Sequence, residues 1–536
     1  MARRHDARDE AVEGNALPGR SSTCPIDHAE AGFAADGGAA VEAEEPSVAA
    51  GSGSFVRAGE APGPRPTPLL GWRADALRLF RDPLGRMLVL RREYGPLVRL
   101  VRGGNRPLFA EGRARTSRGG EPGTYFALGS EVVRELLMRS DDFGTSRPPG
   151  PDTPSYRRLS ENLLFFDGAR HRSRRRLLFR FFDRAHLRAY EAPMRDATQT
   201  LLDRCHVGAT IDLAAEMRRL SLEISGATLF GIDATEREDS LAHEMAAMID
   251  ALVSPLALLP IDLPGTPRRR LIRRMDSIAA RLDEEIARRA NAEGNDFLTW
   301  LVRSQREEPD QMTRDELAGQ SFLMFFAGHD TSWKALAWIL FLLATHPRVQ
   351  DELRAELQAK IGDGAVGFDD AFRLPVLDRV IREGLRVLTP SALFPRTAAR
   401  DTTLAGCRVA AGSDVVYSPF VVHRDAEVFP HPARFDPARW DAVRPTRWQY
   451  LPFGAGAHSC LGASFGRLQL GLVVGEIVRA VRLAAIDSTR VDLEVRSVVG
   501  PRGRLPVRIE APSNGSAGSP VRVRGDLARL VEFPDR

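Results

Sequence analysis

The run Phe453–Gly462 carries Cys460 at the end of a glycine-rich turn, where its thiolate could bind a metal. The glycines allow a tight hairpin whose backbone approaches a flat ligand closely. A helix is expected from Ala463 to Val478, so its N–H groups and the positive end of its dipole should lower the pKa of Cys460. Phe453 can shield the sulfur, and His458 can face a carboxylate. This residue set suits an iron porphyrin held by sulfur; the competing interpretation is a buried, inert thiol.

A second constellation, Ala327-Gly328-His329-Asp330-Thr331-Ser332, lies in the middle of a long apolar helix. Thr313 and Glu316 form a capping box at its start, and Pro347 ends it. Gly328 allows a ligand to approach the helix backbone. The Thr331 hydroxyl can bond back to the carbonyl of Ala327 and open the helix locally. Asp330 supplies an ionisable group beside that opening; the alternative is a helix-interior acid paired with an arginine.

A third pattern is a charged pair, Glu383 and Arg386, three residues apart on one expected helix. Such pairs are common on solvated faces and alone indicate little. Another arginine, Arg439, follows just before the cysteine loop.

These motifs together resemble those of the cytochrome P450 family, the haem-thiolate monooxygenases. The family pattern Phe-x-x-Gly-x-x-x-Cys-x-Gly is met at Phe453, Gly456, Cys460 and Gly462. Residues 327–332 resemble the family's oxygen-binding motif, and the resemblance covers residues 62–510 with every landmark in order. It implies haem b as cofactor, with Cys460 as the axial iron ligand and Ala327 and Gly328 against the porphyrin. Thr331 would steady iron-bound oxygen, and Asp330 would relay protons to it.

The resemblance also assigns groups around the haem. Glu383, Arg386 and Arg439 would form a structural network that locks the segment before the cysteine loop. Four residues would bind the haem propionates, namely His171, Arg175, Arg396 and His458. The remaining arginines near His171 either form a docking face for an acidic ferredoxin or a solvated helix face; these are Arg170, Arg172, Arg174, Arg176 and Arg180.

The expected fold is mainly α (α+β), a cytochrome P450 fold with one large helical domain and small β-sheets. The haem would lie between the long oxygen-motif helix and the helix after the cysteine loop. We expect a disordered tail over 1–61, a single haem domain over 62–510 with a surface insertion at 102–123, and a polar C-terminal extension over 511–536. Within the domain, helical periodicity over Trp72–Tyr94 precedes two short strands, Leu97–Val101 and Tyr125–Leu128.

Composition restricts the remaining choices. A net charge of +4 gives no argument for nucleic acid binding. The four cysteines lack the paired spacing of disulfides or zinc sites, which fits a reducing cytoplasm. The N-terminal region has no apolar run, so we expect no signal peptide or membrane anchor. The protein is expected to be a monomer.

The sequence therefore predicts a monooxygenase that inserts one atom of O₂ into a lipophilic small molecule of the fatty acid, terpenoid or polyketide class. Electrons would come from NAD(P)H through a reductase and a separate ferredoxin or flavodoxin. The alternatives are a peroxide-driven peroxygenase, a haem-thiolate rearrangement enzyme and a haem-based sensor. The substrate pocket is expected from mostly apolar segments, namely 143–166, 252–264, 325–331, 391–394 and Val498 with Val499.

Overall fold

The computed structural model describes residues 59–109, 121–146, 150–232, 240–252, 255–258, 261–496, 498–512 and 521–534. Almost all of the predicted N-terminal tail, residues 110–120 of the predicted insertion and residues 513–520 of the predicted extension lie outside these ranges.

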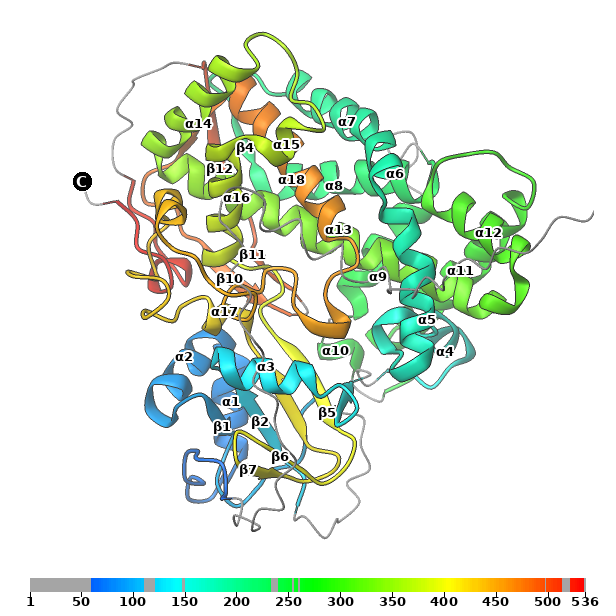
Figure 1. Ribbon diagram of the computed structural model, residues 1–536, viewed down its shortest axis with the longest axis vertical. Coiled ribbons are helices and arrows are strands. Elements are labelled where there is room, and N and C mark those ends of the chain that lie inside the picture. Colours follow the sequence, from blue (N-terminus) through cyan, green and yellow to red (C-terminus); the bar gives the residue numbers. More distant parts are fainter. Residues whose placement is uncertain are drawn as a thin grey trace, which may run out of the picture. The chain divides into compact units, whose positions relative to one another are not determined.

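Helices make up most of the described chain, as predicted (Figure 1). Their bounds in the first half are α1 Arg73–Arg81, α2 Pro83–Tyr94, α3 Ser130–Met138, α4 Pro154–Leu159, α5 Gly168–Phe179, α6 Arg184–Ala189, α7 Glu191–Asp203, α8 Leu213–Phe230 and α9 Leu241–Leu252. Those in the second half are α10 Pro255–Leu258, α11 Pro267–Arg288, α12 Phe297–Glu307, α13 Arg314–Thr345, α14 Pro347–Lys360, α15 Asp370–Arg373, α16 Pro375–Val387, α17 Pro419–Val422 and α18 Ala463–Ala480.

The strands form small, separate sheets. Their bounds are β1 Leu97–Arg99, β2 Thr124–Ala127, β3 Phe143–Thr145, β4 Thr210–Asp212, β5 Phe394–Ala398, β6 Thr402–Leu404, β7 Cys407–Val409, β8 Asp414–Tyr417, β9 Arg482–Ala485, β10 Asp492–Val495, β11 Val499–Arg502 and β12 Pro506–Glu510. The largest sheet has the order β1-β2-β8-β5-β3, in which only β2 and β8 run parallel. It places Arg396, on β5, opposite Thr145 on β3.

The long helix α13 is the centre of the core. It spans 32 residues, begins with the predicted capping box of Thr313 and Glu316, and ends one residue before His346. Its residues 335–344 are apolar on all sides and buried, with Trp338 and Phe341 fully enclosed. Both α8 and α18 pack against α13, so the helix after the cysteine loop lies beside the oxygen-motif helix (Figure 1).

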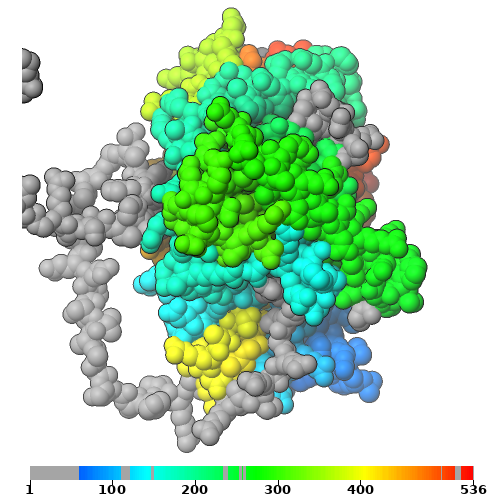
Figure 2. Space-filling model, turned by 90° about the vertical axis from the view of Figure 1, so that its right-hand side faces the viewer, coloured from blue at the N-terminus to red at the C-terminus, as the bar shows by residue number. Residues whose placement is uncertain are grey.

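On one face of the molecule, α11 and α12 cover the core. Figure 2 shows this green region above the cyan region that contains α4 and α5. The guanidinium of Arg158 on α4 donates two hydrogen bonds, each of 2.6 Å, to the carboxylate of Asp283 on α11, and this pair joins the two helices. No helix in the described ranges combines the length and apolar character that crossing a bilayer requires.

The predicted helical stretch Trp72–Tyr94 is two helices instead of one. Asp82 separates α1 from α2, because Pro83 cannot continue a helix and the Asp82 side chain accepts the N–H of Gly85 as an N-cap. The predicted pair of short strands is confirmed as β1 and β2, which are antiparallel.

Candidate functional site

The cysteine loop forms the predicted tight turn. The Cys460 N–H donates to the carbonyl of Phe453 at 2.8 Å, and residues Gly456–His458 form one 3₁₀ turn between them. Gly456 adopts a left-handed φ of 73°, and a Cβ built there would lie 3.1 Å from the Leu137 carbonyl oxygen. A larger residue at 456 would therefore both strain the backbone and crowd α3.

The Cys460 side chain is exposed, and it is one of the free cysteines of the described chain. The prediction that N–H groups and the positive end of the helix dipole would give this thiol a lowered pKa is wrong in its net direction. Desolvation by the surrounding protein raises the pKa of the thiol, while the Gly462 N–H and the Arg175 guanidinium act in the opposite direction. A bound metal ion deprotonates a coordinating thiol outright, so this shift does not oppose iron ligation.

In the middle of α13, one strip of the helix surface is accessible to solvent. Ala327 is exposed, and Gly328 and Thr331 are half-buried. The nearest atom to a Cβ built on Gly328 is the Leu229 Cδ1, at 3.8 Å. The predicted bond from the Thr331 hydroxyl to the Ala327 carbonyl is present at 2.6 Å. The helix nevertheless remains helical throughout, so the predicted local opening of α13 is absent.

Phe325 was predicted to line the substrate pocket, but it faces away from this strip. Two residues along a helix correspond to a rotation of about 200°, so Phe325 lies opposite Ala327. It is fully buried, and its ring packs 5.9 Å from that of Phe230 on α8.

Asp330 is buried and has an ion-pair partner, although that partner is a lysine and not the arginine considered as the alternative. The Lys334 ammonium lies 2.8 Å from one carboxylate oxygen and 2.9 Å from the other. The Trp333 indole N–H also donates to Asp330, at 3.1 Å. Both partners come from the next turn of the same helix.

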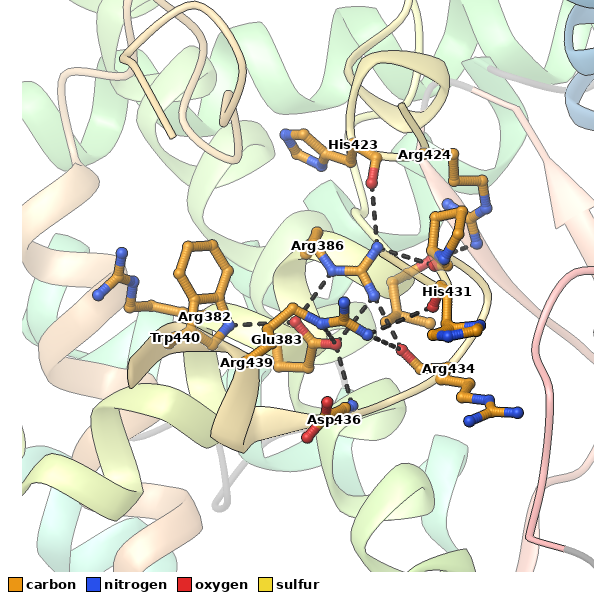
Figure 3. A network of polar contacts seen from close by, with 12 residues as sticks. Arg382, Glu383, Arg386, His423, Arg424, His431, Arg434, Asp436, Arg439 and Trp440 are labelled. Carbon is orange, nitrogen blue, oxygen red and sulfur yellow. Dashed lines mark hydrogen bonds and ion pairs between the residues drawn. The ribbon is translucent and has the colours of Figure 1, made fainter. Parts of the chain in front are cut away.

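The charged residues Glu383, Arg386 and Arg439 form one buried network, as the resemblance implied (Figure 3). Arg386 donates twice to Glu383, at 2.9 and 2.8 Å, and Arg439 donates once, at 2.8 Å. The Asp436 N–H and the Trp440 indole N–H also donate to Glu383, at 3.0 and 3.1 Å.

The rest of the Arg386 guanidinium binds backbone. It donates to the carbonyls of His423, Pro432 and Arg434, at 3.0, 2.8 and 2.9 Å. The network therefore ties helix α16 to the irregular segment 423–440 that leads to the cysteine loop.

The predicted propionate-binding residues converge near the cysteine loop. The rings of His171 and His458 lie 4.0 Å apart, and Arg175 donates to the Ser459 carbonyl at 2.7 Å and to its hydroxyl at 3.0 Å. Arg396 and His458 line the same small cavity. Burial lowers the pKa of His171 to about 4, and the neighbouring His458 ring and Arg175 guanidinium act in the same direction, so the His171 ring is neutral at pH 7.

These residues fit a group that carries two carboxylates. Among the described residues, neither Arg175 nor Arg396 has a carboxylate partner, although both are largely buried. Buried cations are normally paired with anions. A haem placed against Cys460 would supply the two missing carboxylates.

Three of the five arginines in the predicted docking face lie close to acidic side chains. Arg170 and Arg174 both bind the buried carboxylate of Glu316, and Arg180 lies 3.7 Å from Glu308. The other two, Arg172 and Arg176, are exposed and have no acidic partner among the described residues.

Sequence reasoning missed the role of the C-terminal segment 521–534. This segment packs on the domain, with Val523, Leu527 and Val531 buried. Glu532 pairs with Arg434 at 2.9 Å, next to the carbonyls that Arg386 binds. The signal was present in the spacing of its apolar residues, which the overall polar composition of 511–536 obscured.

The helical fold, the cysteine loop beside a long helix and two arginines without a carboxylate partner among the described residues fit a haem-thiolate protein. The family model "Cytochrome P450" matches residues 61–502, and the chain belongs to this family. Cyclooctatin synthase of Streptomyces melanosporofaciens is 30% identical over 79% of this chain and 90% of its own length. Pentalenene oxygenase of Streptomyces avermitilis is 29% identical, over 86% of this chain and 99% of its own.

Among solved structures, a retinoic acid-bound cyanobacterial CYP120A1 matches with a TM-score of 0.70 and 25% identity, over 84% of this chain and 99% of that one. The expected fold class is thereby confirmed. The protein is a cytochrome P450 monooxygenase, and haem b is its cofactor.

Proposed function

We propose that this monooxygenase oxidises a terpenoid, with Cys460 as the iron ligand and Asp330 and Thr331 as the polar groups beside the reacting centre. Three relatives support the substrate class: cyclooctat-9-en-7-ol 5-monooxygenase, cyclooctatin synthase and pentalenene oxygenase. Of the three classes expected from the apolar segments, the terpenoids are the one that these relatives favour.

The observation that carries the proposal is the open strip of α13. Within residues 321–345, Ala327 is exposed, and the half-buried residues are Phe326, Gly328, Thr331, Trp333 and Lys334. Of these, Ala327, Gly328 and Thr331 carry little side-chain bulk. A flat cofactor and an apolar guest can therefore approach the helix there, where the Thr331 hydroxyl is the polar group available.

When bound, the haem supplies the activation of O₂ for insertion of one oxygen atom, and the thiolate increases the electron density at the iron. The chain's own residues do the rest. Arg175, Arg396, His171 and His458 hold the propionates and fix the porphyrin plane. Thr331 orients a water or an oxygen atom by its hydroxyl, and Asp330 passes protons toward that hydroxyl.

Electrons come from NAD(P)H through a separate reductase and a ferredoxin or flavodoxin. Arg172 and Arg176 support docking of an acidic partner, because both are exposed and neither is engaged with an acid among the described residues. The cysteines, which lack paired spacing, support a cytoplasmic location for this exchange.

A binding screen tests the substrate class. The purified haem protein is titrated with cyclic terpenes, terpene alcohols, long-chain fatty acids and polyketide lactones while the haem spin-state shift is followed. We expect terpenes to produce the largest shift at the lowest concentration. A fatty acid or polyketide that binds tighter than every terpene would overturn the terpenoid assignment. Turnover of the best ligand under ¹⁸O₂ should place one labelled atom in the product.

A further inference from the structure

The Asp330 carboxylate is held by two groups on the next turn of α13. The Lys334 ammonium contacts both oxygens, at 2.8 and 2.9 Å, and the Trp333 indole N–H contacts one of them at 3.1 Å. The exposed fractions are 8% for the Asp330 side chain and 12% for that of Lys334. The order Asp then Lys, four residues apart, is the favourable orientation for such a pair on a helix.

The composition of the chain makes this lysine unusual. Lys334 and Lys360 are the only lysines, whereas lysine and arginine together number 75. An arginine at 334 would present a longer, planar group, while an ammonium is a compact charge that can contact both carboxylate oxygens from one point.

Strand β11 leaves the space that the Lys334 side chain fills. A Cβ built on Gly500 would lie 2.8 Å from Lys334 Cε, 3.1 Å from Cδ and 3.2 Å from Cγ. The φ of Gly500 is not positive, so the backbone there does not require glycine. The absence of a side chain at 500 therefore leaves room for the lysine stem beside β11.

The neighbouring ionisable groups do not replace this cation. Burial lowers the pKa of His329 to about 3, so its ring is neutral at pH 7. Arg218 on α8, whose charge acts on His329, is engaged with Asp250 on α9. Among the described residues, Lys334 is the cation in contact with Asp330.

We propose that Lys334 is a positioning residue that keeps Asp330 ionised and in place between turnovers, as a proton relay requires. The inference rests on the proposed role of Asp330. The carboxylate leaves the ammonium, accepts a proton that solvent delivers as a hydronium ion, and passes that proton to a water beside the Thr331 hydroxyl, so that the negative charge of the carboxylate is restored. Without Lys334, a buried carboxyl would hold a proton instead of passing it on.

The test compares Lys334→Met with Lys334→Arg, which keeps the charge, and with Lys360→Met, which removes the only other lysine. In Lys334→Met we expect an infrared C=O band of a protonated carboxyl at pH 7. The wild type should lack this band, and so should the double variant Lys334→Met/Asp330→Asn, which has no carboxyl at position 330. Lys360→Met should show no band, and Lys334→Arg a weaker one. If Lys334→Met shows no band that depends on Asp330, the proposal is wrong.

Turnover supplies the second readout. Hydrogen peroxide brings oxygen that is already reduced and protonated, so reactions driven by it need no relay. We expect Lys334→Met to lose at least tenfold in turnover driven by NAD(P)H and O₂, but less than twofold with peroxide. Equal losses in both reactions would show a merely structural role.

Gly500→Ala provides an independent variant, because its Cβ displaces Lys334 without altering either charge. It should reproduce the infrared band and the selective loss at lower amplitude, and wild-type behaviour would count against the proposal. Failure of the proposed function can be told apart from failure of this proposal. A protein that is inactive with both O₂ and peroxide would contradict the proposed function, and its infrared spectrum would still show whether Lys334 controls the protonation of Asp330.

Discussion

The buried carboxylate of Glu383 should control whether the haem region folds. In Glu383→Gln the side chain keeps its shape but loses its charge. The wild-type residue accepts five hydrogen bonds, and its amide replacement would direct an NH₂ group at some of the same donors. Arg386 and Arg439, whose side chains are 0% and 5% exposed, would lose their common counter-charge.

The magnitude follows from this burial. Removing one partner of a buried ion pair costs about 3–5 kcal/mol, because an uncompensated charge remains in the interior. A native domain is stable by only about 5–15 kcal/mol, so the variant should lose a large part of its stability. Because Arg386 and Arg439 also hold the carbonyls of segment 423–440, the cysteine loop should lose its support and with it the haem.

A matched control is an exposed ion pair whose arginine lies in segment 423–440. Glu532 pairs with Arg434 at the surface, where the side chains are 54% and 59% exposed. Glu532→Gln should therefore cost no more than about 1 kcal/mol.

The assay is urea unfolding, together with the ratio of haem to protein after purification. We expect Glu383→Gln to show a clearly lower unfolding midpoint and less than half of the wild-type haem content, and Glu532→Gln to match the wild type. Full haem content and an unchanged midpoint in Glu383→Gln would refute the assignment of the network as the support of the loop.

Three further predictions concern other parts of the fold. Gly456→Ala should lower the free energy of unfolding by about 1–2 kcal/mol because of backbone strain, and crowding against Leu137 should lower it further. Gly406 is also left-handed, but nothing lies within 4 Å of a Cβ built there, so Gly406→Ala measures the effect of strain alone in urea unfolding. Truncation after residue 512 removes three buried apolar side chains worth about 1.5–3 kcal/mol each, so the melting temperature should fall, and an unchanged value would mean that segment 521–534 does not pack. Burial lowers the pKa of His346 from 6.5 to about 4, so the unfolded chain binds a proton at a higher pH than the folded chain does. The free energy of unfolding should therefore fall by up to about 3 kcal/mol as the pH falls from 6.5 to 4. In His346→Gln, the slope of the free energy of unfolding against pH should be smaller by the contribution of one proton.

Features that depend on local spacing could be predicted from the sequence. The capping box of Thr313 and Glu316 and the bond from Thr331 to Ala327 both join residues three or four positions apart, where helix geometry fixes the distance. Family resemblance extended this to long-range contacts, because it named Arg439 as the partner of Glu383 across 56 residues.

Features that depend on tertiary surroundings could not be predicted. The pKa of Cys460 reflects how much protein surrounds it, and the sequence shows only the helix that follows. The partner of Asp330 lay within reach at Lys334, four residues along the helix, but the sequence does not show that Gly500 on β11 leaves room for the lysine stem. The packing of the C-terminal segment could not be predicted because its buried residues are spaced among polar ones. The segment also pairs with residues far away in the sequence, through the bridges of Glu532 with Arg434 and of Arg524 with Arg490.

The most direct test of the account is the absorption spectrum of the reduced protein under carbon monoxide, for the wild type and for Cys460→Ser. We predict a red-shifted Soret band in the wild type, which thiolate ligation produces, and its loss in the variant. A wild-type spectrum typical of imidazole ligation, or a red-shifted band that survives in Cys460→Ser, would contradict the claim that this sulfur holds the iron.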